Sequence, residues 1–158
     1  MSLDRIRLAS LHDKVISAEE ASAFIEDGMT VGMSGFTRAG EAKAVPLALV
    51  KRAHTNPLKI TLITGASLGN DLDKQLTEAG VLARRLPFQV DNTLRKAINN
   101  GEVMFIDQHL SETVEQMRNL QLKKPDVAII EAVAITEDGG IIPTCLLYTS
   151  DAADDSLR

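Results

Sequence analysis

The chain has 158 residues, of which 44% are hydrophobic and 25% are charged, and its formal net charge is −5 at pH 7. This length and composition are those of one globular domain of ordinary size. No apolar run approaches the length of a membrane span, no signal-peptide core lies near the start and no basic block is present, so we expect a cytoplasmic protein without membrane or nucleic-acid partners.

The first predicted helix begins at a capping box. Ser17 is followed three residues later by Glu20, and apolar residues recur at helical spacing as far as Ile25. Gly28 is the predicted stop. Residues 5–14, which precede this helix, are predicted to form a short extended or helical segment on the surface.

A short strand and a glycine loop follow this helix. Met29 to Met33 is short, apolar and β-branched at its centre, which predicts a buried strand. Gly35 and Gly40 bracket the loop after it. A second helix is predicted from Ala44 to His54, because Pro46 is tolerated in a first turn.

The order of strand, glycine turn and helix then repeats. Residues 59–64 have the near-continuous apolar character of a parallel strand, and the turn 65–69 leads into a helix over 71–79. The repeat predicts an α/β fold with a mostly parallel sheet flanked by helices, whose ligand sites lie at the carboxyl ends of the strands. The remaining predicted elements are strands over 81–86, 103–106 and 126–134, helices over 91–100 and 111–122, and a hairpin turn at 137–140.

The glycine loop is the strongest candidate site from the residues alone. Glycine permits a positive φ and a close approach of another molecule, so a strand end, this loop and a helix start can present N–H groups to an anionic or carbonyl oxygen. A tight connection without a ligand is the alternative, because the spacing of Gly32, Gly35 and Gly40 matches neither the dinucleotide fingerprint nor the P-loop.

Five segments carry a family signature: SGFTRAG, LITGAS, LPFQVDNTLRKAIN, DQHLS and AIIEAVAITEDGGIIPT. Together they resemble the class I coenzyme A transferases, and most of all the acetyl-CoA hydrolase/transferase family, which includes succinyl-CoA:acetate CoA-transferases. The resemblance is nearly continuous from Arg5 to Thr144. It departs at Ala42, where the family usually has proline. We therefore expect residues 1–144 to be part of the N-terminal domain of this family.

The resemblance implies an enzyme that moves coenzyme A between an acyl-CoA, such as acetyl-CoA or succinyl-CoA, and a small carboxylate. A glutamate would attack the thioester to give an acyl-glutamyl anhydride, the CoA thiolate would return to form a glutamyl-CoA thioester, and an acceptor carboxylate would complete the exchange. That glutamate is expected beyond Thr144, so the chain alone should be inactive. Coenzyme A is a substrate, no separate cofactor or metal is expected, and the full-length enzyme is expected to be a homodimer.

The residues expected to contact the substrate come from three loops. Ser67 alone would more often be a turn-forming serine, but the resemblance places it in the acyl or carboxylate pocket. The family often carries threonine where this chain has Val90, which favours a less polar acyl group if the position faces it. The full set of expected contacts is Ser34, Gly35, Phe36, Gly40, Ser67, Gln89 and Val90.

Several other polar residues are interpreted as structural. Arg84 and Arg85 could bind a CoA phosphate or a carboxylate, but a solvated edge or a salt bridge within an oligomer is favoured. Asp107 and His109 are separated as i and i+2 at a strand end, but no nucleophile lies near them in the sequence. Glu131 is interpreted as a structural or pocket-lining acid rather than as the nucleophile. The three histidines are too scattered to predict a metal site.

Two alternatives to CoA transfer stay open. A hydrolase would use the same glutamate but pass the acyl group to water. A non-catalytic α/β domain, or a sugar-phosphate isomerase of related architecture, would bind phosphate esters without thioester chemistry.

The last stretch of the chain differs from what precedes it. Residues 145–155 read CLLYTSDAADD, which resembles the in-frame translation of a transposon adapter used in DNA library preparation. The only cysteine and the only tyrosine, Cys145 and Tyr148, both lie in it. We expect residues 145–158 to be foreign, which leaves no cysteine for a disulfide or a thiolate metal site.

Overall fold

The structure, a computed structural model, describes residues 3–36, 39–66, 68–69 and 71–143. Five strands form one sheet in the order β4-β3-β2-β1-β5, and every neighbouring pair is parallel. The strands are β1 (Thr30–Met33), β2 (Ile60–Thr64), β3 (Leu82–Leu86), β4 (Met104–Phe105) and β5 (Val127–Ile129). The helices are α1 (Ala18–Ala23), α2 (Ala44–Ala53), α3 (Leu72–Glu78), α4 (Asn92–Asn99) and α5 (Leu110–Arg118). The predicted α/β fold with a mostly parallel sheet is confirmed.

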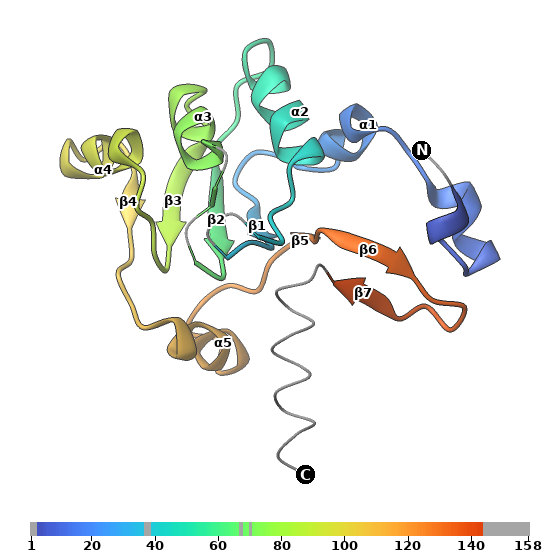
Figure 1. The fold of residues 1–158 in the computed structure, drawn as a ribbon. Helices are drawn as coiled ribbons and strands as arrows, with labels where there is room; N and C mark the ends of the chain where they lie inside the picture. Colours follow the sequence, from blue (N-terminus) through green and yellow to red (C-terminus); the bar gives the residue numbers. More distant parts are fainter. Residues whose placement is uncertain (1–2, 37–38, 67, 70, 144–158) are drawn as a thin grey trace.

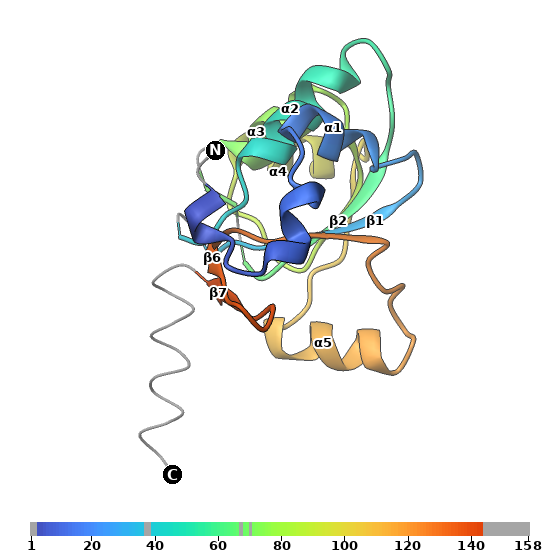
Figure 2. The same cartoon turned by 90° about the vertical axis from the view of Figure 1, so that its right-hand side faces the viewer.

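The helices divide unequally between the two faces of the sheet. Helices α1 to α4 lie on one side, and α5 lies on the other (Figures 1 and 2). The main core is on the four-helix side, where Val31 and Leu62 of the sheet pack with Leu49 and Leu76 of the helices, all at 0% exposure. Burying each such side chain contributes about 1.5–3 kcal/mol. The α5 side of the sheet is covered far less.

The caps predicted for α1 and α4 are present. Ser17 Oγ accepts from the Glu20 N–H at 3.1 Å, and the Glu20 carboxylate accepts from the Ser17 N–H at 2.8 Å. Asp91 accepts from two N–H groups in the first turn of α4, each at 2.8 Å. Helix α1 nevertheless ends at Ala23, well before Gly28. The Arg52 guanidinium of α2 donates to carbonyl oxygens of residues 22 and 25 and so completes that end of the helix.

Helix α5 is shorter than predicted and is capped by a histidine. The His109 ring accepts from the Ser111 N–H at 3.4 Å, so His109 is the N-cap residue. The helix ends at Arg118 rather than at Leu122, and Leu120 takes a positive φ of 58° just after it. His109 therefore has the structural role that the sequence predicted.

Strand β3 contains a bulge that sorts its two arginines to opposite faces. The pairing with β2 skips from Leu82 to Arg84, which leaves Ala83 as the extra residue. Arg84 consequently lines the α5 side of the sheet, whereas Arg85 points to the four-helix side. The bulge is the local reason why a run of two arginines fits within a buried strand.

Arg85 forms a buried ion pair with Asp73 of α3. Its Nε lies 2.9 Å from Asp73 Oδ1, and the two side chains are 0% and 1% exposed. Arg85 also donates to the Leu86 carbonyl at 2.5 Å and to the Ala66 carbonyl at 3.4 Å. The interpretation of Arg85 as a residue of a solvated edge or an oligomer salt bridge is therefore wrong. Its partner is within the chain, because α3 places a carboxylate directly over the strand.

The long buried strand predicted over 126–134 is also wrong. The chain breaks after β5, which is an edge strand, and continues as β6 (Ala132–Ile135), which pairs antiparallel with β7 (Ile141–Pro143). At the break, the Glu131 N–H donates to Ser34 Oγ at 2.9 Å instead of to a strand. Ser34 thus diverts the backbone out of the parallel sheet. The predicted hairpin turn before β7 is present.

The N-terminal segment lies beside β6. It contains two 3₁₀ helices, Leu3–Arg5 and Ala9–Lys14, and the Arg7 N–H donates to the Ile135 carbonyl at 2.9 Å. Among the helices in the described ranges, none has the length and apolar character needed to cross a membrane.

Removal of the Asp73 carboxylate should destabilise the fold strongly. We expect Asp73→Ala to lower the free energy of unfolding by about 3–5 kcal/mol, because it leaves the Arg85 charge buried without a partner. Lys74→Ala, an exposed change on the same helix, is the control and should stay within about 0.5 kcal/mol of wild type. Urea unfolding measures both, and a loss below about 1 kcal/mol for Asp73→Ala would contradict this role for the pair.

The start of β5 should make stability depend on acid pH. The Asp126 carboxylate accepts from Lys123 Nζ at 2.7 Å and from the Thr30 N–H at 2.8 Å, and these two bonds hold the pKa of Asp126 below its ordinary value of 3.8. Because the pKa is lowered on folding, the stabilisation is complete above pH 3.8 and is lost as pH falls through the lowered pKa.

Asp126→Asn should therefore be less stable than wild type at about pH 6, and the difference should shrink at about pH 3 and below as the wild-type carboxyl takes up a proton. Urea unfolding at both pH values gives the comparison. A difference that does not change with pH would show that the Asp126 charge does not stabilise this strand pair.

Candidate functional site

Three loops leave the sheet at the same edge. Because β1, β2 and β3 are parallel neighbours, their carboxyl ends lie side by side, as Figure 1 shows. We call this side of the sheet the carboxyl edge. We call residues 34–43 the first loop, 65–71 the second loop and 87–91 the third loop. Six of the seven residues expected to contact substrate lie in their described parts, and Ser67 lies outside the described residues.

Ser34 closes the first loop. Its N–H donates to the Ile129 carbonyl at 2.9 Å, and its hydroxyl donates to the Gly40 carbonyl at 2.6 Å while accepting from the Glu131 N–H at 2.9 Å. One side chain therefore joins the two ends of the loop and ties both to the end of β5. Its hydroxyl is engaged in positioning the loop.

Gly35 adopts a backbone conformation that would be strained in any residue with a side chain. Its φ is 152°, and a Cβ atom there would lie 3.1 Å from Leu68 Cδ2 and 3.2 Å from Glu41 Cβ. Its carbonyl accepts from the Ala66 N–H of the second loop at 3.3 Å. Within the ranges that the structure describes, its own N–H makes no hydrogen bond. Gly35 therefore offers a free backbone donor where no side chain fits.

Glu41 is the residue of this edge that the sequence reasoning missed. Its side chain is 0% exposed although it lies in a loop, and its carboxylate accepts from the Gly69 N–H at 2.5 Å. From the sequence alone, an acidic residue flanked by glycine and alanine is expected to be exposed to solvent. The one available signal was the second glycine turn, whose N–H groups need an acceptor. Glu41 and Gly35 together hold the first and second loops against each other.

Phe36 begins a tight turn in the first loop, and Gly40 follows this turn. The Phe36 N–H donates to the Ala39 carbonyl at 2.9 Å, and the Ala39 N–H donates back at 3.2 Å, which forms a tight turn. The Phe36 side chain is 51% exposed. An aromatic ring is thus presented to solvent at the edge where a ligand would arrive.

The third loop carries Gln89 and Val90. Val90 is 54% exposed, so its side chain is open to contact. The Gln89 Oε1 atom is buried and has no hydrogen-bond partner among the described residues. The hydrogen bonds between described residues join the third loop neither to the first loop nor to the second. The structure therefore brings Ser34, Gly35 and Gly40 together and leaves Gln89 and Val90 on a separate loop of the same edge.

Glu131 pairs with Lys43 at the end of the first loop. The Lys43 Nζ lies 3.4 Å from Glu131 Oε1, and the Glu131 side chain is 32% exposed. With its N–H on Ser34, Glu131 fastens both ends of the first loop to the chain after β5. These contacts agree with a structural acid.

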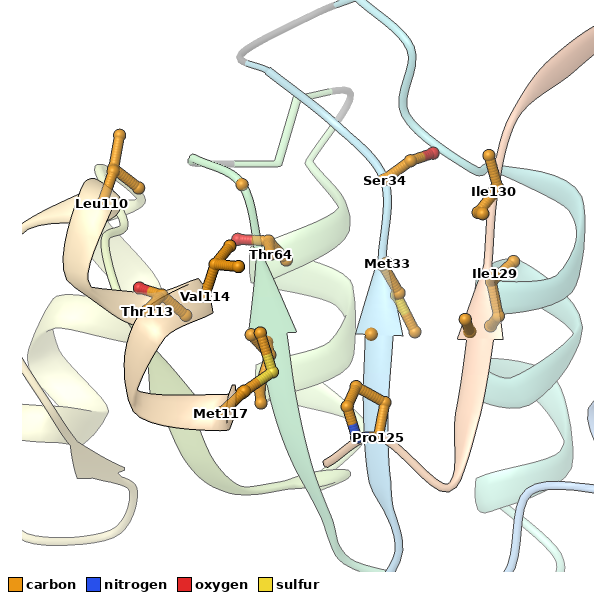
Figure 3. A pocket seen from close by; sticks show the side chains of 14 residues that line it. Met33, Ser34, Thr64, Leu110, Thr113, Val114, Met117, Pro125, Ile129 and Ile130 are labelled. Carbon is orange, nitrogen blue, oxygen red and sulfur yellow. The ribbon is translucent and has the colours of Figure 1, made fainter. Parts of the chain in front are cut away.

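A cavity of about 280 Å³ lies under α5, against the sheet face opposite the main core. Figure 3 shows side chains of α5, among them Val114 and Met117, directed toward the strands, with Ser34 and Thr64 at the strand ends. The cavity therefore begins where the first and second loops begin.

The chemistry available at this edge is that of backbone donors and apolar surface. Among the described residues of the three loops, no nucleophile is hydrogen-bonded to a histidine, and the Glu41 carboxylate is sealed from solvent. The edge can bind and polarise an oxygen atom through N–H groups such as that of Gly35. The described residues of this edge do not show an activated attacking group.

Comparisons with known proteins identify the family of the chain. Residues 2–153 match the family described as the acetyl-CoA hydrolase/transferase N-terminal domain. The match includes residues 145–153, part of the segment expected to be foreign, so that expectation stays a prediction.

Two curated relatives illustrate the similarity. The chain is 45% identical over 142 residues to the succinyl-CoA:acetate CoA-transferase of Clostridium kluyveri, which covers 89% of this chain and 26% of that protein. It is 38% identical over 150 residues to an acetyl-CoA hydrolase of Schizosaccharomyces pombe, which covers 88% of this chain and 29% of that protein. The chain thus spans between a quarter and a third of the length of these relatives.

A solved acyl-CoA transferase from Escherichia coli O157:H7, determined as a thioester complex with CoA, has a similar fold, with a TM-score of 0.52 and 17% identity. The similarity covers 65% of this chain and 22% of that one. The match to the family over nearly the whole sequence, together with these relatives, shows that the chain belongs to the acetyl-CoA hydrolase/transferase N-terminal domain family.

Proposed function

We propose that this chain is the N-terminal part of an enzyme that transfers coenzyme A between an acyl-CoA and a small carboxylate through a glutamyl-CoA thioester. The nucleophilic glutamate would come from polypeptide beyond Thr144, so the chain alone has no turnover. The whole enzyme would act in the cytoplasm, in acetate and acetyl-CoA metabolism, as a homodimer. Coenzyme A is its substrate, and the proposal needs no separate cofactor.

The observation that carries this proposal is the free N–H of Gly35 at the carboxyl edge. A thioester carbonyl gains negative charge on oxygen when it is attacked, and a fixed backbone donor stabilises that charge without having to reorient. Gly35 is fixed by the packing of Leu68 and Glu41 against it. The proposal assigns to the first loop the binding of the thioester oxygen.

Hydrolysis is the second candidate, because the Schizosaccharomyces pombe relative is named an acetyl-CoA hydrolase. The same acyl-enzyme chemistry would pass the acyl group to water. Product analysis distinguishes the two reactions in the full-length enzyme. Transfer consumes an acceptor carboxylate and yields its CoA ester, whereas hydrolysis yields free CoA with or without an acceptor.

Gly35→Ala in the full-length enzyme tests the role of the first loop. We expect kcat/KM for acyl-CoA to fall by about 10²–10³, because the added Cβ displaces the backbone donor from the oxyanion. Gly80→Ala is the matched control. Gly80 also has a positive φ, of 68°, but a Cβ there meets nothing within 4 Å. The control should lose about 1–2 kcal/mol of stability and keep its activity.

Steady-state kinetics and melting curves on both variants give the result. The first loop is only a connection between β1 and α2 if Gly35→Ala retains kcat/KM within about threefold of wild type, and the proposal then loses its structural support.

A further inference from the structure

The Glu41 side chain is fully buried in a loop that borders the candidate site. It is 0% exposed, and its carboxylate accepts from the Gly69 N–H at 2.5 Å, from a residue 28 positions away in the chain. A carboxylate that is sealed from solvent does not touch a substrate that arrives from solvent. Burial also removes its hydration, so hydrogen bonds within the protein must replace the lost water. Any role of Glu41 at this edge therefore acts through the groups that it holds in place.

Glu41 contacts both loops at once. Its Cβ and Cα atoms lie 3.2 Å and 3.4 Å from the position that a Cβ atom of Gly35 would take, so its stem packs against the first loop. The next residue, Ala42, donates its N–H to the Ser34 carbonyl at 3.4 Å. The carboxylate meanwhile fixes this segment to Gly69 of the second loop.

The Ser34 carbonyl and the Gly35 N–H belong to the same peptide group, just after β1 (Figure 3). This group is planar and trans, so its C=O and its N–H point in opposite directions. A hydrogen bond that fixes the carbonyl therefore also fixes the direction of the N–H. The Ala42 N–H supplies that bond.

The second loop holds the other side of Gly35. The Gly35 carbonyl, which belongs to the following peptide group, accepts from the Ala66 N–H at 3.3 Å. The two peptide groups on either side of the Gly35 α-carbon are thus both fixed, one by Ala42 and the other by Ala66. Because Ala66 and Gly69 belong to the same loop, the bond from Glu41 to Gly69 joins the supports of the two peptide groups to each other.

We propose that Glu41 is a positioning residue that fixes the direction of the Gly35 N–H. Its carboxylate, bound to Gly69, keeps Ala42 on the Ser34 carbonyl. The target of the Gly35 N–H, the thioester oxygen, comes from the proposed function, on which this inference rests. A donor that already points at this oxygen stabilises the developing charge without having to reorient during the reaction.

A purely structural role is the alternative to positioning. In that case the bond between Glu41 and Gly69 stabilises the fold, and its loss lowers the melting temperature without changing the chemical step in the enzyme that stays folded. The two roles differ in their effect on kcat. A misdirected donor lowers kcat and kcat/KM equally, because the lost interaction is made only in the transition state.

Three substitutions of Glu41 in the full-length enzyme separate the reach of the side chain from its charge. Glu41→Ala removes the acceptor. Glu41→Asp keeps a carboxylate but is one carbon shorter, so it does not reach the Gly69 N–H from the same backbone position. Glu41→Gln keeps the length and one acceptor oxygen. Ile25→Val, a change at a buried residue before β1, is the control for destabilisation away from the carboxyl edge.

Steady-state kinetics with acetyl-CoA and succinate, at a temperature below all melting transitions, give the first readout. We expect Glu41→Ala and Glu41→Asp to lower kcat and kcat/KM together by about tenfold or more, with KM changed by less than about twofold. Glu41→Gln should keep most of the activity, because its amide oxygen accepts from the same N–H. Ile25→Val should lower the melting temperature and leave kcat unchanged.

Hydrogen exchange gives a second readout that does not depend on turnover. In Glu41→Ala, the amides of Ala42 and Gly69 should exchange about tenfold faster than in the wild type or more, because both lose their support. Amides within β2 should keep their wild-type rates. Ile25→Val should leave the exchange of Ala42 and Gly69 unchanged.

Unchanged exchange at Ala42 in Glu41→Ala overturns the positioning role, and so do equal losses of kcat in Glu41→Gln and Glu41→Ala. The proposed function is tested separately by Gly35→Ala. If Gly35→Ala loses activity while Glu41→Ala keeps kcat within about threefold of wild type, only the inference about Glu41 fails. If Gly35→Ala keeps its activity, or the wild type turns over no CoA ester, the proposed function fails, and exchange at Ala42 still decides whether Glu41 fixes this peptide group.

Discussion

The buried ion pair between Arg85 and Asp73 is the constraint on which the carboxyl edge depends. Beyond binding each other, the two residues hold the second loop, because Asp73 accepts from the Leu68 N–H at 3.3 Å and Arg85 donates to the Ala66 carbonyl at 3.4 Å. The first loop rests on the second through Glu41. A pair of opposite charges without solvent has little freedom to move, since separating it would leave each charge unsolvated. Rigidity therefore passes from β3 and α3 to the described parts of the first and second loops, which lie outside the named helices and strands.

This support matters for a site that acts through its backbone. A backbone N–H cannot be re-aimed by a rotamer change, so its usefulness depends on how firmly the loop around it is held. Gly35 meets this need because its neighbours leave no room at its α-carbon, while Ser34 fastens the loop to β5. The same serine diverts the chain out of the sheet after β5. The Ser34 hydroxyl thus positions the first loop and also determines where the edge strand β5 ends.

Local signals in the sequence were sufficient for most elements. The caps at Ser17 and Asp91 depend on residues three or fewer positions apart, and the positive φ of Gly35 follows from the needs of a tight loop. The failures share a different cause, because each depends on a partner far along the chain. Arg85 is buried because α3 brings Asp73 over β3, and the strand predicted over 126–134 is broken by an interaction with Ser34. Glu41 likewise meets an amide 28 residues away.

Hydrogen exchange on the full-length protein tests most directly the central claim that the first and second loops receive the acyl-CoA thioester. The informative amides are those of Gly35, Ala66 and Gly69, compared with and without saturating acyl-CoA. The account predicts slower exchange at Gly35 when acyl-CoA is bound, and exchange at Ala66 and Gly69 that is already slow without it because their N–H groups are bonded across the loops. Unchanged exchange at Gly35 in the saturated enzyme, or rapid exchange at the other two amides in the free enzyme, would contradict it.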